Sequence, residues 1–330
     1  MHRLHVIGLS LVLVVFFMSM AWADSDHQLK VYGATFPSNY ALYVLDPELL
    51  AGWNGPLRAY EKKFIPEKYQ QLPILGGWYG AGMIPDKEVL IQAGFDKAFV
   101  LVGQKQQTHE SLQVLEKLGF DVLALPDVFL RDAASSFETM GAAFGVPERG
   151  AALGAYGQQA MANVADSLKG LPENSYVRVY FAQDVDGLTT ICGQSSRADV
   201  ITLAGGINVH QCSQGMEEGV IKISFEQIML YDPDVILINH PTCMHNFAQD
   251  SRWQALRAVR QGQVYFVPYE PFSWLDRPAS FMRFLGVQWL ANTLHPDRFP
   301  MDMEKETDRF LQLFFRLDLS TDAIQKILHP

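Results

Sequence analysis

Short apolar runs alternate with helical patterns along the chain. In the first half the runs are Leu29 to Ala34, Lys97 to Val102 and Asp121 to Leu125, which are partly β-branched and bounded by Gly or Pro. Between the last two runs, Thr108 to Leu118 has helical periodicity, with its leucines on one face. A strand, a helix and a second strand in this order predict a parallel sheet covered by helices.

The same alternation begins again in the second half of the chain. Tyr176 to Ala182, Val235 to Asn239 and Val264 to Pro268 are further compact runs typical of strands, and Asp302 to Arg316 and Thr321 to Leu328 have helical patterns. We therefore predict an α/β protein with two lobes, each built on a central, mostly parallel sheet flanked by helices.

The segment between the two units has the pattern of a helix. Pro147 opens it, an apolar stripe rich in alanine runs along it, and Gly170 and Pro172 end it. A flexible linker would be rich in Ser, Gly or charge. A helix of about twenty residues spans roughly 30 Å, so we predict that a single long helix joins the lobes and allows little movement between them.

The predicted organisation follows from these segments. The N-terminal lobe covers residues 24–146, the connecting helix 147–172 and the C-terminal lobe 173–295. Residues 296–330 are expected to form two helices packed on the outside.

The N-terminus has the pattern of a secretory signal peptide. Arg3 gives a short positive region, Leu9 to Met20 is almost unbroken apolar sequence, and Ala21-Trp22-Ala23 fits a small-x-small cleavage site. A membrane anchor would need a longer apolar segment, and polar residues follow at once. We expect residues 1–23 to be removed and the mature protein to be soluble and exported, without membrane insertion; the family resemblance described below implies the periplasm. Because no Cys stands at the cleavage site, we expect no lipid anchor.

Composition and charge limit the functions that the chain can have. Apolar residues make up 48% and charged residues 19% of the 330, which excludes a disordered or coiled-coil protein. The 26 basic and 36 acidic residues give a net charge of −10, and removal of residues 1–23 takes away only Arg3 and leaves −11. With this acidic balance and no basic patch, a nucleic acid partner is not expected.

Three cysteines, Cys192, Cys212 and Cys243, remain in the mature chain. In an oxidising compartment we expect one disulfide and one free thiol. Cys192 and Cys212 are nearest in sequence, which is weak evidence, and the pairing stays open.

The common catalytic motifs are missing from the chain. It contains no G-x-x-x-x-G-K-[ST] pattern for phosphate, no H-E-x-x-H and no G-x-S-x-G. A catalytic triad could still assemble from distant residues, but nothing in the sequence proposes one, and we expect no enzyme.

Aromatic and polar residues follow the predicted strands. In open α/β units the carboxyl ends of strands face the ligand crevice, so these side chains are candidates for contact with a bulky, partly apolar ligand. The candidates are Asn39, Trp78, Tyr79, Tyr180, His240, Tyr269 and Trp274. The alternative for each loop is ordinary turn chemistry with surface aromatics, but tryptophans in corresponding loops of both lobes favour a ligand site.

Residues 240–245 place two imidazoles, a thiol and a thioether close together. Such donors suit nickel, copper or zinc. His240, Cys243 and His245 are therefore candidate metal ligands, although no second pair of ligands at fixed spacing supports them. The alternative is a disulfide at Cys243, with both histidines exposed to solvent.

Five short segments, in this order, are typical of one transport family. They are Pro37 to Asn39, Asp86 to Ile91, Ala204 to Asn208, Ser224 to Ile228 and Trp274 to Ser280. With them the chain resembles the periplasmic substrate-binding proteins of ABC importers for metal chelates, such as the iron–siderophore, haem and cobalamin receptors. The resemblance implies two lobes on a rigid backbone helix, with the chelate held between them.

The resemblance also implies partners. In these receptors one surface Glu on each lobe docks on the ABC permease dimer, and the corresponding positions are Glu88 and Glu226. Exposed carboxylates at these positions would fix how the protein is placed on a basic partner surface. The alternative is that each is a solvated acid at a helix N-terminus, which the helix dipole favours. We also expect Arg277 to pair with an anionic group of the ligand; the alternatives are a salt bridge with Asp276 or a contact at a helix end.

The family implies a monomer without a cofactor, in which a metal enters only as part of the transported ligand. The chelate could be an iron–siderophore, haem, cobalamin or nickel complex, and the sequence does not choose among them.

Three alternatives stay open. A free metal-ion receptor would need three or four converging His, Asp or Glu. A molybdate or tungstate receptor would need Arg277 and loop amides, and an exported enzyme would act without a permease.

Overall fold

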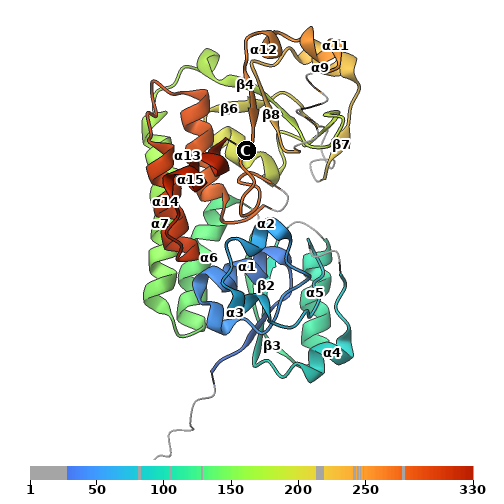
Figure 1. Cartoon of the computed structure of the whole chain (residues 1–330). Helices are drawn as coiled ribbons and strands as arrows, with labels where there is room; N and C mark the ends of the chain where they lie inside the picture. Colours follow the sequence, from blue (N-terminus) through green and yellow to red (C-terminus); the bar gives the residue numbers. More distant parts are fainter. Residues whose placement is uncertain are drawn as a thin grey trace, which may run out of the picture.

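The computed structural model describes residues 28–80, 83–103, 106–127, 129–212, 219–240, 243, 245, 247, 249–276 and 279–329. They form two α/β lobes beside a group of long helices (Figure 1). No helix among these residues is both long enough and apolar enough to span a bilayer. The predicted signal peptide, residues 1–23, lies outside the described residues.

The N-terminal lobe contains a parallel sheet in the order β1-β2-β3. Its strands are β1 (Val31–Gly33), β2 (Lys97–Val102) and β3 (Asp121–Pro126). Val31 pairs with Lys97 and Lys97 pairs with Asp121, so the strands begin in register. All three predicted strands are confirmed, and β1 is shorter than expected because Thr35 already caps the following helix.

Helices cover this sheet and connect its strands. They are α1 (Phe36–Leu45), α2 (Ala59–Lys62), α3 (Glu67–Gln70), α4 (Lys87–Gln92), α5 (Gln106–Lys117) and α6 (Leu130–Ala143), with a 3-10 helix at Pro47–Leu49. The predicted helix between the second and third strands is α5. Its buried positions Thr108, Ser111 and Leu115 lie three or four residues apart, so one face packs inward.

The C-terminal lobe has a four-stranded parallel sheet in the order β6-β4-β8-β9. Its strands are β4 (Val177–Ala182), β6 (Gly206–Asn208), β8 (Val235–Ile238) and β9 (Val264–Phe266), with a separate antiparallel pair β5 (Thr189–Thr190) and β7 (Ile221–Lys222). Its helices are α8 (Asp199–Leu203), α9 (Phe225–Tyr231), α11 (Ser251–Gln254) and α12 (Arg257–Arg260), with 3-10 helices at Glu173–Ser175 and Ser196–Ala198. The three strands predicted here are confirmed.

The long helix α7 (Pro147–Ser167) runs along both lobes (Figure 1), as the sequence predicts. Pro147 stands in its first turn, where a missing backbone N–H costs no helical hydrogen bond. α7 approaches α6 closely at Gly150, where an added Cβ would lie 2.4 Å from the carbonyl oxygen of Phe137 and 2.7 Å from the Cα of Gly141. Only glycine fits at this approach.

Three further helices end the chain: α13 (Arg283–Leu294), α14 (Met303–Phe315) and α15 (Thr321–Leu328). They lie on the same side of the molecule as α7 (Figure 1). One face of α14 enters the interior, where the Phe315 ring lies 6.3 Å from the rings of both Tyr43 and Phe64 in the N-terminal lobe. The last helices therefore do more than cover the outside, because they also connect the lobes.

One hydrophobic core continues through both lobes. It includes Val31 and Phe99 of the first sheet and Phe181 and Leu237 of the second. Two smaller clusters, one in each lobe, contain the residues on the other faces of the sheets. The two sheets are thus packed on a common interior and not only tethered by α7.

Candidate ligand site between the lobes

The chain segments that follow β1 and β9 meet between the two lobes. Phe36, just after β1, lies edge to face with Phe272, after β9, at 5.7 Å between ring centroids. The Tyr40 ring lies 4.8 Å from the same Phe272 ring. The carboxyl ends of strands from both sheets therefore face one region, as expected for ligand sites of open α/β units.

The turn from β1 into α1 is more deeply buried than the sequence indicates. Thr35 caps α1 by accepting a hydrogen bond from the Ser38 N–H, and all ten residues of α1 are buried. Asn39 is only 1% exposed, and its amide donates to the Gly52 carbonyl at 2.8 Å. The Asn39 side chain, which we expected to contact a ligand, holds α1 against the segment at Gly52, and Asn39 also lines the hollow described below.

Trp78 and Tyr79 lie in a loop over the start of α1. The Trp78 N–H donates to the Ala34 carbonyl at 3.0 Å, and the Phe36 N–H donates to the Tyr79 carbonyl at 2.9 Å. Gly80 follows with φ of 75°, and a Cβ there would lie 2.8 Å from Phe36 Cβ, so the loop depends on glycine. Both aromatic side chains are half-buried, which leaves part of each open.

A hollow of about 50 Å³ lies beside this loop. Its lining includes Phe36, Tyr40, Asn54, Arg58, Glu61 and Gly80. Three buried polar atoms there, Tyr40 Oη, Asn54 Oδ1 and Glu61 Oε1, have no hydrogen bond of good geometry with the described residues. Because buried polar atoms are almost always hydrogen-bonded, and a volume of this size admits water or a small polar group, the hollow is suited to polar atoms of a ligand.

Glu61 is the buried acid of this hollow. It is 3% exposed, and its Oε2 accepts a hydrogen bond from the Arg58 N–H at 2.6 Å. Burial raises the pKa of Glu61, and the backbone N–H and charge of Arg58 together with the Tyr40 hydroxyl only partly offset this rise. Burial and the nearby Glu61 carboxylate raise the pKa of Tyr40, whose hydroxyl stays protonated. The hollow thus offers both acceptor oxygens and one hydroxyl donor.

A buried polar network supports the opposite rim, in the C-terminal lobe. Asp276 is 1% exposed and pairs with Arg197, whose Nε lies 2.9 Å from Asp276 Oδ1. Gln183, which follows β4, donates to Asp276 Oδ2 at 2.8 Å. Arg197 was missed at the sequence level because it stands on a 3-10 helix away from the predicted strand ends, and no motif marks it.

Asn239 and His240 follow β8 at the same edge. The Ser273 hydroxyl donates to Asn239 Oδ1 at 2.9 Å, and the Asn239 amide donates to the Asp276 carbonyl at 3.4 Å. His240 is half-buried. The network therefore fixes the loop after β9 relative to the end of β8, where the predicted contact His240 stands.

The two rims also touch each other directly. Tyr269 is half-buried, and its ring lies edge-on to Tyr60 of the N-terminal lobe at 6.0 Å. The adjacent Glu270 forms an ion pair with Lys63 at 2.7 Å. Together with Phe272, these contacts close one side of the region between the lobes.

Two predicted ligand contacts are buried away from this region. Tyr180 lies inside β4 with no exposed surface, and its hydroxyl donates to the Gly187 carbonyl at 2.7 Å. Trp274 is equally buried in the common core, and its indole N–H donates to the Glu270 carbonyl at 3.1 Å. Both predictions are wrong, because these side chains point inward. Arg277 lies outside the described residues.

The residues of the predicted metal cluster do not come together. Cys243 has no exposed surface and lies in a hydrophobic cluster, and burial raises the pKa of its thiol to about 12. His245 is exposed and accepts a hydrogen bond from Gln249 at 2.9 Å. The disulfide joins Cys192 to Cys212, so the alternative of a disulfide at Cys243 is also wrong.

Comparison with known proteins identifies the family. Residues 99–271 match the family described as periplasmic binding protein. An ABC transporter solute binding protein of known structure from Sulfurospirillum deleyianum is 33% identical, with 92% of this chain and 95% of that chain covered and a TM-score of 0.85. The chain belongs to the periplasmic binding protein family. A comparison with curated protein sequences found no match.

More distant family structures share the fold. Molybdate-bound MolA of Haemophilus influenzae is 19% identical, with 89% of this chain and 95% of that chain covered and a TM-score of 0.71. The vitamin B12 binding protein BtuF of Vibrio cholerae is 18% identical, with 80% and 96% covered and a TM-score of 0.60.

Family membership confirms the broad functional prediction. The protein is a periplasmic solute-binding protein of an ABC transporter, and its relatives serve transport and not catalysis. A small-molecule ligand and a permease partner follow from that membership. The resemblance to the periplasmic substrate-binding proteins of ABC importers is confirmed at the level of the family.

Proposed function

We propose that this periplasmic binding protein captures a metal chelate between its lobes and delivers it to an ABC permease. The hollow in the N-terminal lobe carries the proposal. Asn54 Oδ1 is a buried acceptor without a hydrogen bond of good geometry among the described residues, and the buried Glu61 carboxyl interacts there only with the Tyr40 hydroxyl and Arg58. They suit a ligand that carries N–H or O–H groups, as the organic part of a chelate does. The half-buried Trp78, Tyr79 and Tyr269 supply aromatic surface for its apolar part.

The chemistry of the hollow disfavours the two alternative ligand classes. An oxyanion such as molybdate presents only acceptor oxygens, so it gains a hydrogen bond from the Tyr40 hydroxyl but none from Asn54 Oδ1 or a Glu61 carboxylate. A bare transition-metal ion needs three or four converging ligands. Among the described residues, the only group of three His, Cys, Asp or Glu that could hold an ion lies elsewhere, at the disulfide.

His240 and Arg277 are the proposed contacts from the C-terminal lobe. His240 stands half-buried at the end of β8, on the edge that carries Asn239. Arg277 offers a planar set of donors for an anionic group of the ligand.

Glu88 and Glu226 are proposed to dock on the permease. They are exposed in the first turns of α4 and α9, which lie at opposite ends of the molecule on the side away from α7 (Figure 1). Hydrogen bonds from its own backbone and from Ser224 hold the pKa of Glu226 below its usual value, so this carboxylate is ionised at neutral pH.

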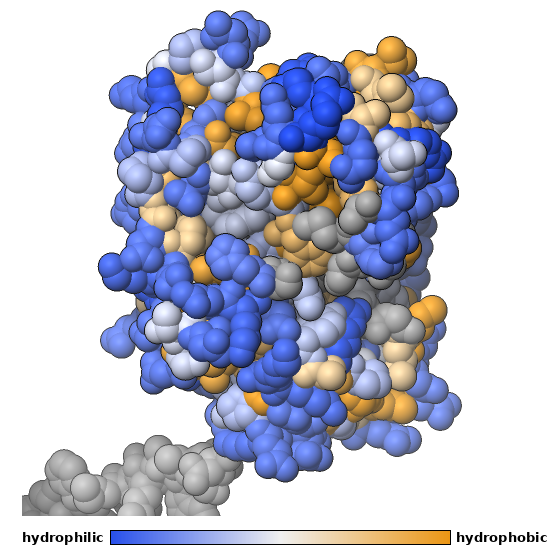
Figure 2. All heavy atoms as spheres, turned by 45° about the horizontal axis from the view of Figure 1, so that its top comes forward, coloured by the Kyte–Doolittle hydropathy of each residue, from blue (hydrophilic) through white to orange (hydrophobic). Residues whose placement is uncertain are grey.

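Exposed aliphatic side chains accompany both acids. Ile84, four residues before Glu88 in the sequence, is 80% exposed, and Leu230, four residues after Glu226 on α9, is 79% exposed. Figure 2 shows that hydrophobic residues on one face of the molecule form separate groups among hydrophilic ones. Small apolar groups beside an acid favour protein contacts with an apolar centre and a charged rim.

The ligand class can be tested by thermal unfolding with haem, cobalamin, a ferric siderophore, nickel–histidine, molybdate and zinc chloride. A ligand that binds the folded protein raises the Tm, and we expect this for one chelate. For that chelate, Glu61→Gln should weaken Kd about tenfold, which is about 1.4 kcal/mol. The control Glu173→Gln changes an exposed acid outside the hollow and should bind normally.

The other outcomes distinguish the alternatives. A shift with molybdate alone would support an oxyanion receptor, and a shift with zinc alone would support a free-ion receptor. No shift with any compound would contradict the chelate proposal.

Docking can be tested with the permease of the same transporter in lipid nanodiscs. Glu88→Arg and Glu226→Arg should each weaken binding to the permease at least tenfold and leave the ligand affinity unchanged. Glu116→Arg, an exposed acid on α5, is the matched control. Normal permease binding by the double variant would contradict the assigned docking sites.

A further inference from the structure

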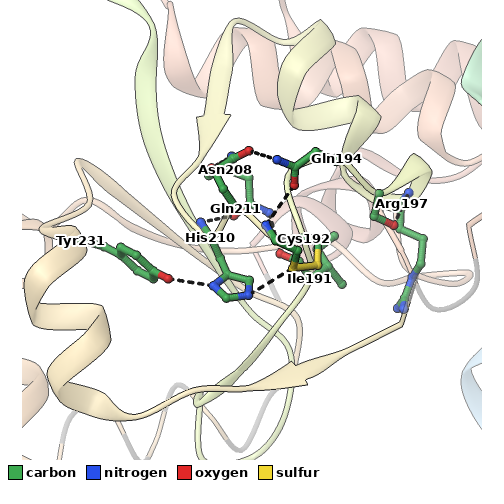
Figure 3. The surroundings of a disulfide bond; sticks show 10 residues. Ile191, Cys192, Gln194, Arg197, Asn208, His210, Gln211 and Tyr231 are labelled. Atoms are coloured by element: carbon green, nitrogen blue, oxygen red, sulfur yellow. Dashed lines mark hydrogen bonds between the residues drawn. A yellow bond between two sulfur atoms is a disulfide. The ribbon is translucent and has the colours of Figure 1, made fainter. Parts of the chain in front are cut away.

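The disulfide of the C-terminal lobe has a histidine beside it. Cys192 follows β5, whereas His210 and Cys212 follow β6. The two sulfur atoms and a ring nitrogen of His210 all lie within 4.8 Å of one another. Figure 3 shows the imidazole turned toward the disulfide, with His210 Nε2 at 3.5 Å from Cys212 Sγ. Two potential thiolates and one imidazole thus converge at one point.

Hydrogen bonds hold the two loops together independently of the sulfur–sulfur bond. The Gly193 N–H donates to the His210 carbonyl at 2.8 Å, and the Cys212 N–H donates to Gln194 Oε1 at 3.1 Å. The Gln194 amide in turn donates to Gln211 Oε1 at 2.6 Å (Figure 3). Because these bonds do not involve sulfur, we expect both loops to keep their positions when the disulfide is reduced.

The imidazole is also oriented for a metal. His210 Nδ1 lies 2.8 Å from the Tyr231 hydroxyl, which fixes the ring from the side opposite the sulfurs (Figure 3). Metal-bound histidines almost always use their second nitrogen in a hydrogen bond of this kind, which sets the ring orientation. Nε2 is then the nitrogen that faces the sulfur atoms.

We propose that reduction of the Cys192–Cys212 disulfide creates a zinc site formed by Cys192, Cys212 and His210. A dithiol reductant transfers two electrons and two protons to the disulfide, which becomes two thiols while the dithiol becomes a cyclic disulfide. Zn²⁺ then displaces both thiol protons to solvent and binds the two thiolates and the Nε2 of His210. Water takes the fourth position of the tetrahedral ion.

The distances agree with this coordination. Zinc–thiolate bonds of about 2.3 Å at a tetrahedral angle place two sulfurs roughly 3.8 Å apart, and the Cα atoms of the two cysteines are 5.5 Å apart. The three donor atoms, already within 4.8 Å of one another, reach this arrangement by side-chain rotation. The same sulfurs serve either the disulfide or the metal, so the redox state decides which is present. This site is separate from the region between the lobes and goes beyond the proposed transport function.

Cobalt provides a direct probe of the site. The protein is reduced with a phosphine, the phosphine is removed under nitrogen, and Co²⁺ is titrated, followed by competition with Zn²⁺. We expect one equivalent of Co²⁺ to give thiolate-to-metal absorption in the near ultraviolet and the visible bands of tetrahedral cobalt, and Zn²⁺ to abolish both. The oxidised protein should show neither signal.

Variants separate this site from other donors. Cys192→Ser combined with Cys212→Ser should lose the signal, and His210→Ala should bind at least tenfold more weakly. Tyr231→Phe removes only the hydroxyl that orients the ring and should weaken binding several-fold with an unchanged fold. Cys243→Ser and His109→Ala change a buried thiol and an exposed histidine elsewhere, and both should behave like the parent protein.

Four results would overturn the proposal. They are absence of thiolate absorption in the reduced protein, equal binding by His210→Ala, equal binding by the oxidised protein, and loss of the near-ultraviolet circular dichroism on reduction. The last result would show that the loops do not keep their positions without the disulfide.

Discussion

At the scale of single residues, buried charges join parts of the chain that are distant in sequence. Arg283 is 1% exposed and lies 3.5 Å from Asp127, which follows β3, and 3.2 Å from Asp199 at the start of α8. Asp199 also accepts a hydrogen bond from the Leu130 N–H at 2.7 Å. One guanidinium therefore connects the two lobes.

The Asp127 carboxyl gives this connection a pH dependence. Burial raises its pKa, and Arg283 only partly opposes this effect. Because the folded state then holds the proton more tightly than the unfolded state, the stabilising contribution of Asp127 is present below about pH 4 and is lost as the pH rises through the folded pKa. We expect Asp127→Asn to equal or exceed the parent protein in stability at pH 7, by about 1 kcal/mol for each unit of pKa shift.

Urea unfolding of both proteins between pH 4 and pH 8 measures this difference. The parent protein should lose stability relative to the variant as the pH rises. If the stability of the variant relative to the parent fell between pH 4 and pH 8, ionised Asp127 would stabilise the fold and the prediction would be wrong.

The ion pair between Arg197 and Asp276 is expected to behave differently from Asp127, because loss of one of its charges should destabilise the protein. Its side chains are 12% and 2% exposed, so removing the arginine leaves a buried carboxylate without its cation. We expect Arg197→Met to cost about 3–5 kcal/mol in urea unfolding. The control Arg252→Met breaks an exposed pair with Asp250 and should cost less than about 1 kcal/mol. Similar costs for the two variants would contradict this account.

Single-residue roles were the part of the site that sequence predicted least well. Trp78 and Trp274 stand in corresponding loops, but one is half-buried and the other has no exposed surface. The inward or outward direction of a loop side chain depends on tertiary packing, which no local pattern contains. Glu61 and Asn54 were missed for the same reason, because only the fold gathers them around one hollow.

At the scale of helices and strands, a helix could be predicted from the sequence when it had one apolar and one polar face. α5 and α15 have one apolar face each and were predicted from it. α1 was missed, because all of its residues are buried and it has no polar face to give a period. Its Thr35 cap and Pro37 are the local signals that could have marked its start.

The crossing of α6 and α7 depends on two glycines that face each other. Gly150→Ala places a Cβ against the Phe137 carbonyl and Gly141, so the helices must separate. We expect a loss of about 1–3 kcal/mol of stability, measured by urea unfolding. Ala151→Leu adds a larger side chain at the next, exposed position and should change stability by less than about 0.5 kcal/mol. An unchanged stability of Gly150→Ala would show that the helices adjust without cost.

At the scale of the whole molecule, the two-lobed plan was predictable but its interior was not. Repeated strand and helix patterns on either side of a helical segment predict two sheets and a connection. These patterns do not indicate which faces of the two sheets pack into a common core. The rings of Phe272 and Phe315, from two separate segments of the C-terminal half, both contact the N-terminal lobe. These contacts depend on tertiary structure alone.

The common core predicts small movements on ligand binding. Spin labels on cysteines introduced at the exposed positions Gln113 and Ala255, one in each lobe, would report the distance between lobes. We expect the mean distance to change by only a few ångströms, of the order of a shear motion and not a hinge closure. Phe272→Ala removes a ring shared by the lobes and should broaden the distribution. A lobe rotation of tens of degrees on binding would contradict this expectation.

The continuous core also has a consequence for how the protein can be divided. A fragment that ended at the connecting helix would expose the apolar face that Phe315, Phe272 and their neighbours cover in the intact chain. Neither half is therefore an independent folding unit, and recombining lobes between family members would require matching interiors as well as matching ligand contacts. The two lobes form opposite sides of the ligand region, but we expect them to fold as a single cooperative unit.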